Sequence, residues 1–230
     1  MEFSGKKVTV VGTGISGIGA VGLLNAVGAE VVLYDGNEKL KIEDIEKKLG
    51  TYKAEIVLGE LTKELTDSSD LLVISPGVPI DSPVVKAFEA AGVPVWGEVE
   101  LAYAFDKGKV LAITGTNGKT TTTALVGQIV GAYHKDTFVV GNIGNPYTTE
   151  VLKSNKDSYT VAEISSFQLE TALTFRPHVS AILNITPDHL NRHKTMECYI
   201  AVKESITKNQ TKDDFCVLNY DDEVLRSFAQ

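Results

Sequence analysis

The sequence predicts an α/β protein made of two successive parallel-sheet units. Short β-branched apolar runs alternate with longer amphipathic stretches, as in strands joined by crossover helices. Two of these runs lead directly into a glycine-rich loop and then a helical pattern, once near the start of the chain and once near its middle. The 230 residues, 43% hydrophobic and 23% charged, suffice for one large domain or two small ones with real cores.

Five strands are expected in the first half of the chain, each a short apolar run. They cover residues 7–11, 30–34, 55–58, 71–74 and 93–95. A helix is expected over residues 18–26, and the charged segment 38–48 is interpreted as the solvated face of a helix.

The second half repeats the pattern. Strands are expected at residues 110–114, 137–140, 159–164, 179–185 and 215–218, with helical patterns at 98–105, 122–130 and 199–206. Glycine and proline cluster over residues 92–97, so the boundary is placed after Gly97. The predicted domains are therefore residues 1–97 and 98–230.

Charge and hydropathy exclude several classes of function. With 22 basic and 30 acidic residues the formal charge is −8, which disfavours a broad electrostatic grip on nucleic acid or an anionic membrane. No uninterrupted apolar stretch of about 18 residues is present, so membrane insertion is not expected. Two cysteines and a start without a secretory signal favour a reduced, cytoplasmic protein. The sequence leaves the oligomeric state open.

The first glycine-rich loop has the spacing GxGxxG, formed by Gly12, Gly14 and Gly17. These glycines permit a tight turn, close approach of the backbone to a ligand phosphate, and close packing of helix on strand. Asp35 ends the next strand, where a dinucleotide-binding fold holds a ribose hydroxyl. A nicotinamide or flavin dinucleotide, another nucleotide-like ligand and a purely structural turn all fit this pattern.

The second loop resembles a P-loop more specifically. It comprises Gly115, Thr116, Asn117, Gly118, Lys119, Thr120 and Thr121, between a strand and a helix. Its backbone N–H groups would surround phosphate, Lys119 would reach the outer phosphates and Thr120 would offer a hydroxyl to Mg²⁺. The full pattern would place another glycine at Ile113, so the loop is a variant. A fortuitous helix start is the alternative.

Polar residues follow two later strands. Glu163 ends one apolar run and is the candidate magnesium carboxylate, with a surface acid as the alternative. Asp188 and His189 follow another, at the edge where open α/β sheets bind ligands. Lys203 lies in a helical pattern and, on spacing alone, is taken as solvated.

Four ordered motifs closely resemble the Mur ligases of peptidoglycan synthesis. They are residues 115–121, Gly141-Asn142-Ile143-Gly144, Glu163 to Glu170, and Leu183 to Leu190, with Ser75-Pro76-Gly77 also in its expected place. The resemblance implies an ATP- and Mg²⁺-dependent ligase that joins an amino acid to a UDP-linked muramoyl precursor through an acyl phosphate. Within the family, the GxGxxG opening and residues 163–170 resemble the branch that adds D-glutamate to UDP-N-acetylmuramoyl-L-alanine.

The resemblance also implies roles for individual residues. Lys119 and the loop amides would hold the phosphates, and Lys119, His189 and Lys203 would be catalytic. The implied magnesium contacts are Thr120, Glu163, His189 and a carbamylated Lys203. Asn142 and His189 would approach the muramoyl substrate. The implied contacts to the UDP part of the precursor are Ile15, Ser16, Asp35, Gly36 and Asn37, together with Ser75 and Gly77.

The members of this family are roughly twice as long and carry a third domain. The expectation is therefore an N-terminal fragment, with an incomplete central domain, that binds precursor and turns over little by itself. Three alternatives remain: a nucleotide-binding module without complete chemistry, a family member specific for another amino acid, and an NAD-dependent oxidoreductase fused to a P-loop domain.

Overall fold

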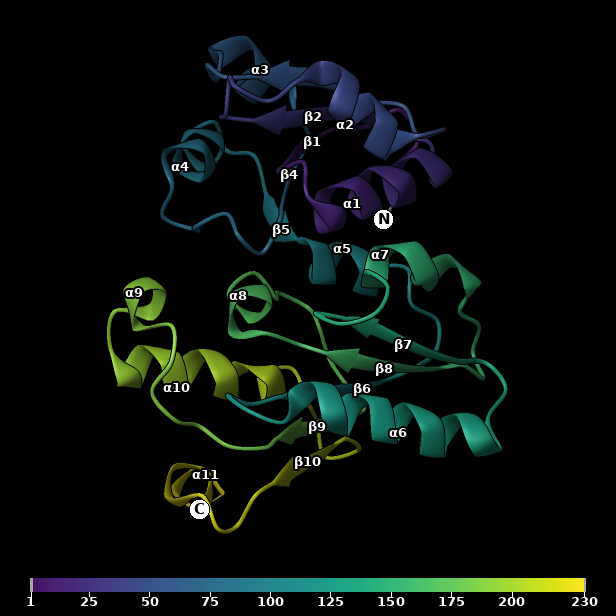
Figure 1. The fold of residues 1–230 in the computed structure, drawn as a ribbon, viewed down its shortest axis with the longest axis vertical. Helices are drawn as coiled ribbons and strands as arrows, with labels where there is room; N and C mark the ends of the chain where they lie inside the picture. Colours follow the sequence, from purple (N-terminus) through teal and green to yellow (C-terminus); the bar gives the residue numbers. More distant parts are fainter. Residues whose placement is uncertain (1, 230) are drawn as a thin grey trace. The chain divides into compact units, whose positions relative to one another are not determined.

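Two five-stranded parallel sheets, one in each half of the chain, organise the fold (Figure 1). The computed structural model describes residues 2–229 and divides into two units, Met1–Ala104 and Phe105–Gln230. All ten strands expected from the sequence are present, with ends shifted by a few residues. The predicted α/β class with two parallel sheets is confirmed.

The first sheet has the strand order β3-β2-β1-β4-β5, with every neighbouring pair parallel. Its strands are β1 (Lys7–Val11), β2 (Glu30–Asp35), β3 (Glu55–Leu58), β4 (Leu71–Ile74) and β5 (Val95–Gly97). The central strands β1 and β4 are almost entirely buried, because helices cover both faces of a parallel sheet.

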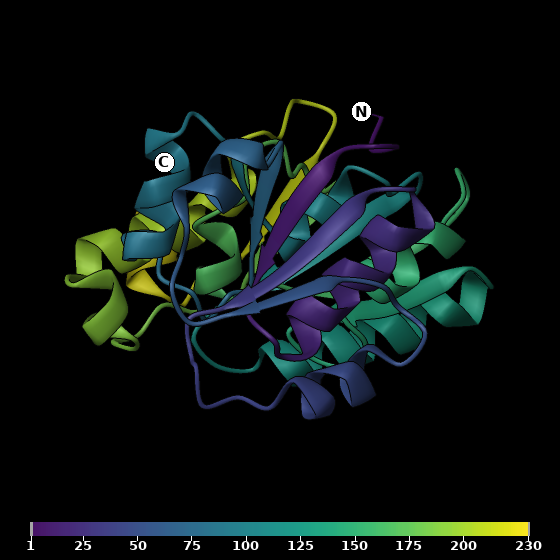
Figure 2. The same cartoon turned by 90° about the horizontal axis from the view of Figure 1, so that it is seen from above.

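Four of the helices of this unit form two pairs in contact, α1 with α2 and α3 with α4. The bounds of the helices in this unit are α1 (Ile15–Ala26), α2 (Ile42–Leu49), α3 (Lys63–Ser68), α4 (Pro83–Ala90) and α5 (Glu98–Tyr103). Right-handed crossovers place the two pairs on opposite faces of the sheet. Figure 2 shows the first sheet from above, with its strands lying side by side. One core cluster joins the sheet to α3 and α4 and includes Val32, Leu65, Leu72, Val85 and Phe88.

The division between the units lies between Ala104 and Phe105, whereas the sequence places it after Gly97. Gly97 is both the last residue of β5 and the N-cap of α5, so the strand continues directly into this helix. Five of its six residues are buried, and α5 contacts α1, β4 and β5. Helix α5 therefore packs as part of the first unit.

The second sheet has the order β10-β9-β6-β8-β7, again with parallel neighbours throughout. Its strands are β6 (Lys109–Thr114), β7 (Thr137–Gly141), β8 (Tyr159–Glu163), β9 (Val179–Ile182) and β10 (Phe215–Leu218). Strand β9 ends at Ile182 rather than at residue 185, because the next residues leave the sheet to contact the loop after β6.

The helices of the second unit are α6 (Lys119–Tyr133), α7 (Tyr147–Glu150), α8 (Ser166–Leu169), α9 (Leu190–His193), α10 (Met196–Glu204) and α11 (Glu223–Phe228). Single 3₁₀ turns follow α7 and α10, at Val151–Lys153 and Ser205–Thr207. The loops after β6, β7, β8 and β9 share the carboxyl edge of this sheet and carry or adjoin the candidate residues of the second unit, except Lys203, which lies on α10. Across residues 2–229, every helix is too short or too polar to cross a lipid bilayer.

Candidate nucleotide and metal site

The loop after β6 needs glycine at two positions. Gly115 has a φ of 146° and Gly118 a φ of 80°, both in the region that side chains disfavour. A Cβ on Gly115 would also lie 3.3 Å from the backbone nitrogen of Asn184. Gly118 is the N-cap of the fifteen-residue helix α6. The strand therefore turns directly into the start of a long helix, which is a favourable place for an anion.

The loop after β9 fixes the outer part of this glycine loop. The backbone N–H groups of Thr116 and Asn117 donate to the main-chain and side-chain oxygens of Asn184, both at 2.9 Å. The Thr116 hydroxyl donates to the carbonyl of Thr186 and accepts from its N–H at 3.0 Å. Because these two amides are engaged, the N–H groups at the start of α6 are the ones suited to phosphate.

Lys119 and Lys203 meet beside this loop. The Lys119 Nζ donates to the carbonyls of Gly115 and Thr116 at 3.0 and 2.9 Å. The Lys203 Nζ donates to the same Gly115 carbonyl at 2.8 Å and lies 4.9 Å from the ring centre of Tyr199. Lys203 is only 2% exposed, so the interpretation from spacing alone, a solvated lysine, is wrong.

Burial, and after it the positive charge of Lys119, lower the pKa of Lys203 to about 7, while Asp188 opposes the shift. A buried amine favours its neutral form, because the ammonium loses hydration that the protein does not replace. Lys203 is thus a nucleophilic amine over a range of pH where an ordinary lysine is protonated.

Glu163 ends β8 with its side chain in the interior, at 1% exposure. One carboxylate oxygen accepts a 2.8 Å hydrogen bond from the Asn142 side chain. The other oxygen, Oε2, is buried without a hydrogen-bond partner among residues 2–229. A buried carboxylate oxygen without a partner costs free energy and is a ready ligand for a hard cation.

Glycine at position 141 lets the backbone before Asn142 lie close to Glu163, since a Cβ on Gly141 would lie 2.2 Å from the carbonyl oxygen of Glu163. Asn142 follows it directly and donates its own N–H to that carbonyl. The structure therefore joins two residues that the sequence assigns to different ligands, Asn142 to the muramoyl substrate and Glu163 to magnesium.

His189 lies at the N-cap of α9 with a φ of 52°, a left-handed conformation in a residue other than glycine. Its Nε2 is 3.5 Å from an Asp188 carboxylate oxygen, and its ring centre is 4.9 Å from that of Phe167. About half of the side chain is exposed. The described part of the chain has no cluster of three or more His, Cys, Asp or Glu side chains, so a cation here would also need hydroxyl, phosphate or carbamate oxygens.

The first unit has its own loop at the carboxyl edge of its sheet. Gly12 has a φ of 105°, and a Cβ on Gly17 would lie 1.9 Å from the carbonyl oxygen of Gly12. These values agree with the tight-turn and close-packing roles expected for the two glycines. Around Gly14, a Cβ would have no described atom within 4 Å, so this position is open to a ligand.

Asp35 is tied to this loop. Its Oδ2 accepts from the N–H and hydroxyl of Thr13 at 3.3 and 3.0 Å, and its Oδ1 accepts from the N–H of Asn37. The Lys48 Nζ donates to the carbonyl of Thr13 at 3.3 Å. Sequence reasoning missed Thr13 and Lys48. Thr13 lay inside the glycine motif, whereas Lys48 had no signal beyond its charge.

The other residues assigned to the UDP part gather at the same edge, at the ends of β1, β2 and β4. Ile15 is 78% exposed, Gly36 and Gly77 are exposed, and Ser16 is half-buried. The hydroxyl of Ser75 is buried beside Gly12, with no hydrogen-bond partner in the described residues. This edge is where open α/β sheets bind ligands.

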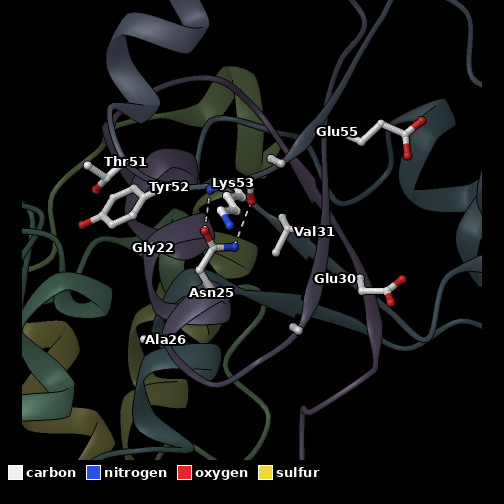
Figure 3. Close-up of a pocket in the computed structure, with 11 residues that line it drawn as sticks. Gly22, Asn25, Ala26, Glu30, Val31, Thr51, Tyr52, Lys53 and Glu55 are labelled. Atoms are coloured by element: carbon white, nitrogen blue, oxygen red, sulfur yellow. Dashed lines mark hydrogen bonds between the residues drawn. The ribbon is translucent and has the colours of Figure 1, made fainter.

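A cavity of about 730 Å³ lies elsewhere in the first unit (Figure 3). Residues of α1 and residues at the amino ends of β2 and β3 line this cavity, which lies at the edge of the sheet opposite to the glycine loop. Asn25 exchanges two hydrogen bonds with the backbone of Lys53, and the ring of Tyr52 covers Gly22. None of the predicted site residues lines it.

A parallel sheet with a GxGxxG turn, followed by a parallel sheet with a P-loop variant, defines a two-unit α/β protein with a Rossmann-like and a P-loop-like unit. The chain belongs to the Mur ligase family. Residues 113–230 match the Mur ligase middle domain, and residues 6–97 match the MurD-like N-terminal domain of Mur ligases. The family predicted from the sequence is confirmed.

Curated relatives match the whole chain. It is 69% identical to a UDP-N-acetylmuramoylalanine--D-glutamate ligase from Lachnospira eligens, over 100% of this chain and 51% of the relative. Ligases of the same name from Lachnoclostridium phytofermentans and Clostridioides difficile are 61% and 47% identical, each over 100% of this chain and 51% of the relative. The chain thus spans about half the length of these relatives.

Solved structures confirm the fold at low sequence identity. The UDP-N-acetylmuramate:L-alanyl-gamma-D-glutamyl-meso-diaminopimelate ligase from Neisseria meningitides has a TM-score of 0.63 at 17% identity, covering 97% of this chain and 74% of that chain. A murein peptide ligase from Psychrobacter arcticus has a TM-score of 0.59 at 17% identity, with coverage of 97% and 51%.

Proposed function

We propose that this chain supplies the precursor-binding unit and much of the phosphate-binding unit of a cytoplasmic ligase that adds D-glutamate to UDP-N-acetylmuramoyl-L-alanine at the expense of ATP. The observation that carries the proposal is the match of the whole chain to relatives of that name, at up to 69% identity. The glycine loop before α6 and the unpaired oxygen of Glu163 supply the chemistry that such an enzyme needs.

The proposed reaction has two steps. A carboxylate oxygen of the precursor attacks the γ-phosphorus of ATP, ADP leaves, and an acyl phosphate forms. The amine of D-glutamate then attacks the acyl carbon, phosphate leaves, and the nitrogen loses a proton. Neither step uses a protein nucleophile, so the residues act by positioning and by neutralising charge.

The start of α6 and Lys119 would hold the phosphates of ATP. Lys119 now donates to two carbonyls of its own loop, and its flexible stem lets it exchange them for phosphate oxygens. The residues present fit Mg²⁺, because Glu163 offers a buried, unpartnered oxygen and Thr120 lies next to Lys119 in the first turn of α6. Bound Mg²⁺ would neutralise charge on the phosphate oxygens. His189 would contact a second Mg²⁺.

Lys203 would act as a carbamate. Its neutral Nζ adds to the carbon of CO₂, a nitrogen–carbon bond forms, and the nitrogen releases a proton. The product is an anion that can contact Mg²⁺, which an ammonium would repel. The lowered pKa favours this step, since only the neutral amine carries a free electron pair.

The UDP part of the precursor would lie at the carboxyl edge of the first sheet, against Gly14, Ile15, Ser16 and the residues after β2 and β4. Asn142 would approach the muramoyl part. Helix N-termini and the loop amides would meet the diphosphate, so the net negative charge of the chain does not oppose binding.

A turnover assay of the full-length protein tests the assignment. Phosphate release from ATP should require both UDP-N-acetylmuramoyl-L-alanine and D-glutamate. Equal turnover with meso-diaminopimelate or L-lysine in place of D-glutamate would instead assign the protein to another branch of the family.

Calorimetry of the 230-residue chain separates the remaining alternatives. The chain should bind the UDP-linked precursor and should not bind NADH. Tight binding of NADH would contradict the ligase assignment. If the full-length protein binds precursor and ATP but releases no phosphate with any amino acid, the binding-module alternative is correct.

A further inference from the structure

A cluster of side chains surrounds His189, the N-cap of α9, and its other members come from α8, from α9 and from the residue after α8. Apart from His189, these residues have no role in the function proposed above. It consists of Ser166, Phe167, Glu170, His189, Arg192 and His193, and is called the Glu170 cluster below. Arg192 donates to Glu170 through Nε at 3.1 Å and through Nη2 at 2.5 Å. His193 Nδ1 lies 3.4 Å from the other carboxylate oxygen, and His193 Nε2 lies 2.9 Å from the Ser166 hydroxyl.

The ring of Phe167 connects this ion pair to His189. The Arg192 guanidinium carbon is 5.0 Å from the Phe167 ring centre, within the range of a cation–π interaction. The His189 and His193 rings lie 4.9 and 5.6 Å from the same centre. Glu170 thus holds two residues of α9 against an aromatic ring that also contacts the imidazole of His189.

The burial of the Glu170–Arg192 ion pair indicates that the cluster fixes the orientation of α9 relative to α8 rather than adding stability. The side chains of Glu170 and Arg192 are only 7% and 13% exposed. Desolvating such a pair costs about as much as its attraction gains, so apolar residues would give similar stability. A buried ion pair with a forked contact does impose one mutual orientation of its two helices.

The backbone of His189 needs such a constraint. Its left-handed φ of 52° costs roughly 1–2 kcal/mol in a residue that has a Cβ. Conformations of this kind persist where the surrounding structure holds them. The hydrogen bonds between the Thr116 hydroxyl and the Thr186 backbone fix one end of the loop before His189, and the Glu170 cluster fixes the other end.

The cluster also connects two candidate metal residues. Helix α8 begins three residues after Glu163, and α9 begins directly after His189. Holding α9 against α8 therefore sets where the imidazole lies relative to the strand that carries Glu163. We propose that Glu170 is a positioning residue for His189, acting through Arg192 and Phe167. The metal arm of the test below rests on the proposed function, whereas the position of the imidazole does not.

Substitution of Glu170 by Gln tests this in the 230-residue chain. The variant keeps the shape of the side chain but removes the charge that holds Arg192. The chain has four histidines, so ¹H–¹³C spectra resolve their rings, and a His189→Gln spectrum assigns that of His189. In Glu170→Gln the His189 ring signals should move toward those of an unstructured histidine, because the contact with Phe167 loosens.

A matched control is Glu150→Gln, which removes another paired carboxylate of the same unit, 2.7 Å from Lys153. It should leave the His189 signals in place. The double variant Glu170→Leu/Arg192→Met replaces the ion pair by apolar side chains and should stay folded while shifting the same signals. Unchanged His189 signals in either Glu170 variant would overturn the positioning role.

Metal binding gives the second readout. The affinity for Mn²⁺, measured by water-proton relaxation with a non-hydrolysable ATP analogue, should fall by about tenfold or more in Glu170→Gln, as when other residues that orient metal ligands are lost. If the His189 signals move while the unsubstituted chain binds no Mn²⁺, the proposed metal role fails and the positioning role stands. If the signals move and Mn²⁺ affinity is unchanged, Glu170 does not position His189 for metal binding.

Discussion

Lys119 and Lys203 donate hydrogen bonds to one acceptor, the carbonyl oxygen of Gly115, at 3.0 and 2.8 Å. Two ammonium groups that share a carbonyl repel each other, and the buried one loses its charge more readily. Burial is the main reason that the pKa of Lys203 falls to about 7, and repulsion from Lys119 across this contact adds to the shift. The contact also places the Lys203 amine beside the Lys119 cation, which would stabilise the proposed carbamate anion.

Replacing Lys203 by Met should stabilise the second unit at low pH. The pKa of Lys203 is lower in the folded protein than the ordinary value of 10.5, so the unfolded chain binds more protons between these two pH values. The cost of the buried charge is therefore fully present below pH 7 and disappears as pH rises to 10.5. Lys203→Met should add on the order of 2 kcal/mol to the free energy of unfolding at pH 6.

Urea unfolding followed by circular dichroism, in bicarbonate-free buffer at pH 6 and pH 9, measures this gain. Fluorescence of Trp96, the one tryptophan, reports the first unit separately and should not change. The gain should shrink at pH 9. A gain of equal size at both values would mean that the folded protein does not lower the pKa of Lys203.

Replacing Lys119 by Ala should weaken ATP binding by more than tenfold and leave precursor binding unchanged. The side chain is the one cation in the first turn of α6, whereas the precursor would bind the other unit. Calorimetry with a non-hydrolysable ATP analogue and with UDP-N-acetylmuramoyl-L-alanine measures both affinities. Equal loss of both would show that Lys119 acts on the fold instead of the phosphates.

The strands and both glycine loops could be predicted because each is encoded locally. Strands such as β1 and β4 are short runs rich in β-branched and other apolar residues, and they are buried at almost every position because helices cover both faces of the sheet. The loops carry glycine where a positive φ or a close approach demands it, as at Gly12 and Gly115. The four-residue helices α7, α8 and α9 are too short for a helical period and were not expected.

The site could be predicted only in part. Lys203 appears solvated on spacing alone, and its burial depends on the packing of α10 against the loop after β6, which no local pattern encodes. The bond from Thr13 to Asp35 and the pair of Glu170 and Arg192 join residues 22 apart in the sequence. Such pairs follow from the tertiary arrangement, which propensity and periodicity do not contain.

Replacing Asp214 by Asn should destabilise the second unit by about 2 kcal/mol near neutral pH, the loss expected for hydrogen bonds to a buried charge. The Arg176 side chain, then the Thr211 N–H and His178, hold the pKa of this carboxyl well below its usual range. The Asp214 side chain is 3% exposed. Its contribution is therefore present above the pKa of an unfolded Asp, about 4, and is lost as the pH falls through the lower value of the folded protein.

Hydrogen exchange of peptides from β9 and β10 measures this loss within the second unit. The difference between Asp214→Asn and the unsubstituted chain should be largest near pH 7 and should narrow below pH 4. Asp213→Asn, which changes an exposed neighbour, is the control and should have little effect. If protection in β10 is the same in both variants, the Arg176–Asp214 pair does not stabilise this edge of the sheet.

Alanine substitutions at Gly14 and Gly17, two glycines of one loop, should affect different properties: Gly17→Ala the stability of the first unit, and Gly14→Ala the binding of the precursor. A methyl group on Gly17 would lie 1.9 Å from the Gly12 carbonyl oxygen, so Gly17→Ala should lower the stability of the first unit by about 3 kcal/mol, the upper end for overpacking. On Gly14 the methyl group would have no described atom within 4 Å, so the fold should be kept. If the precursor diphosphate binds there, Gly14→Ala should weaken its binding by about tenfold, or 1.4 kcal/mol. Trp96 fluorescence in urea measures stability and calorimetry measures binding; unchanged precursor binding in Gly14→Ala would place the diphosphate elsewhere.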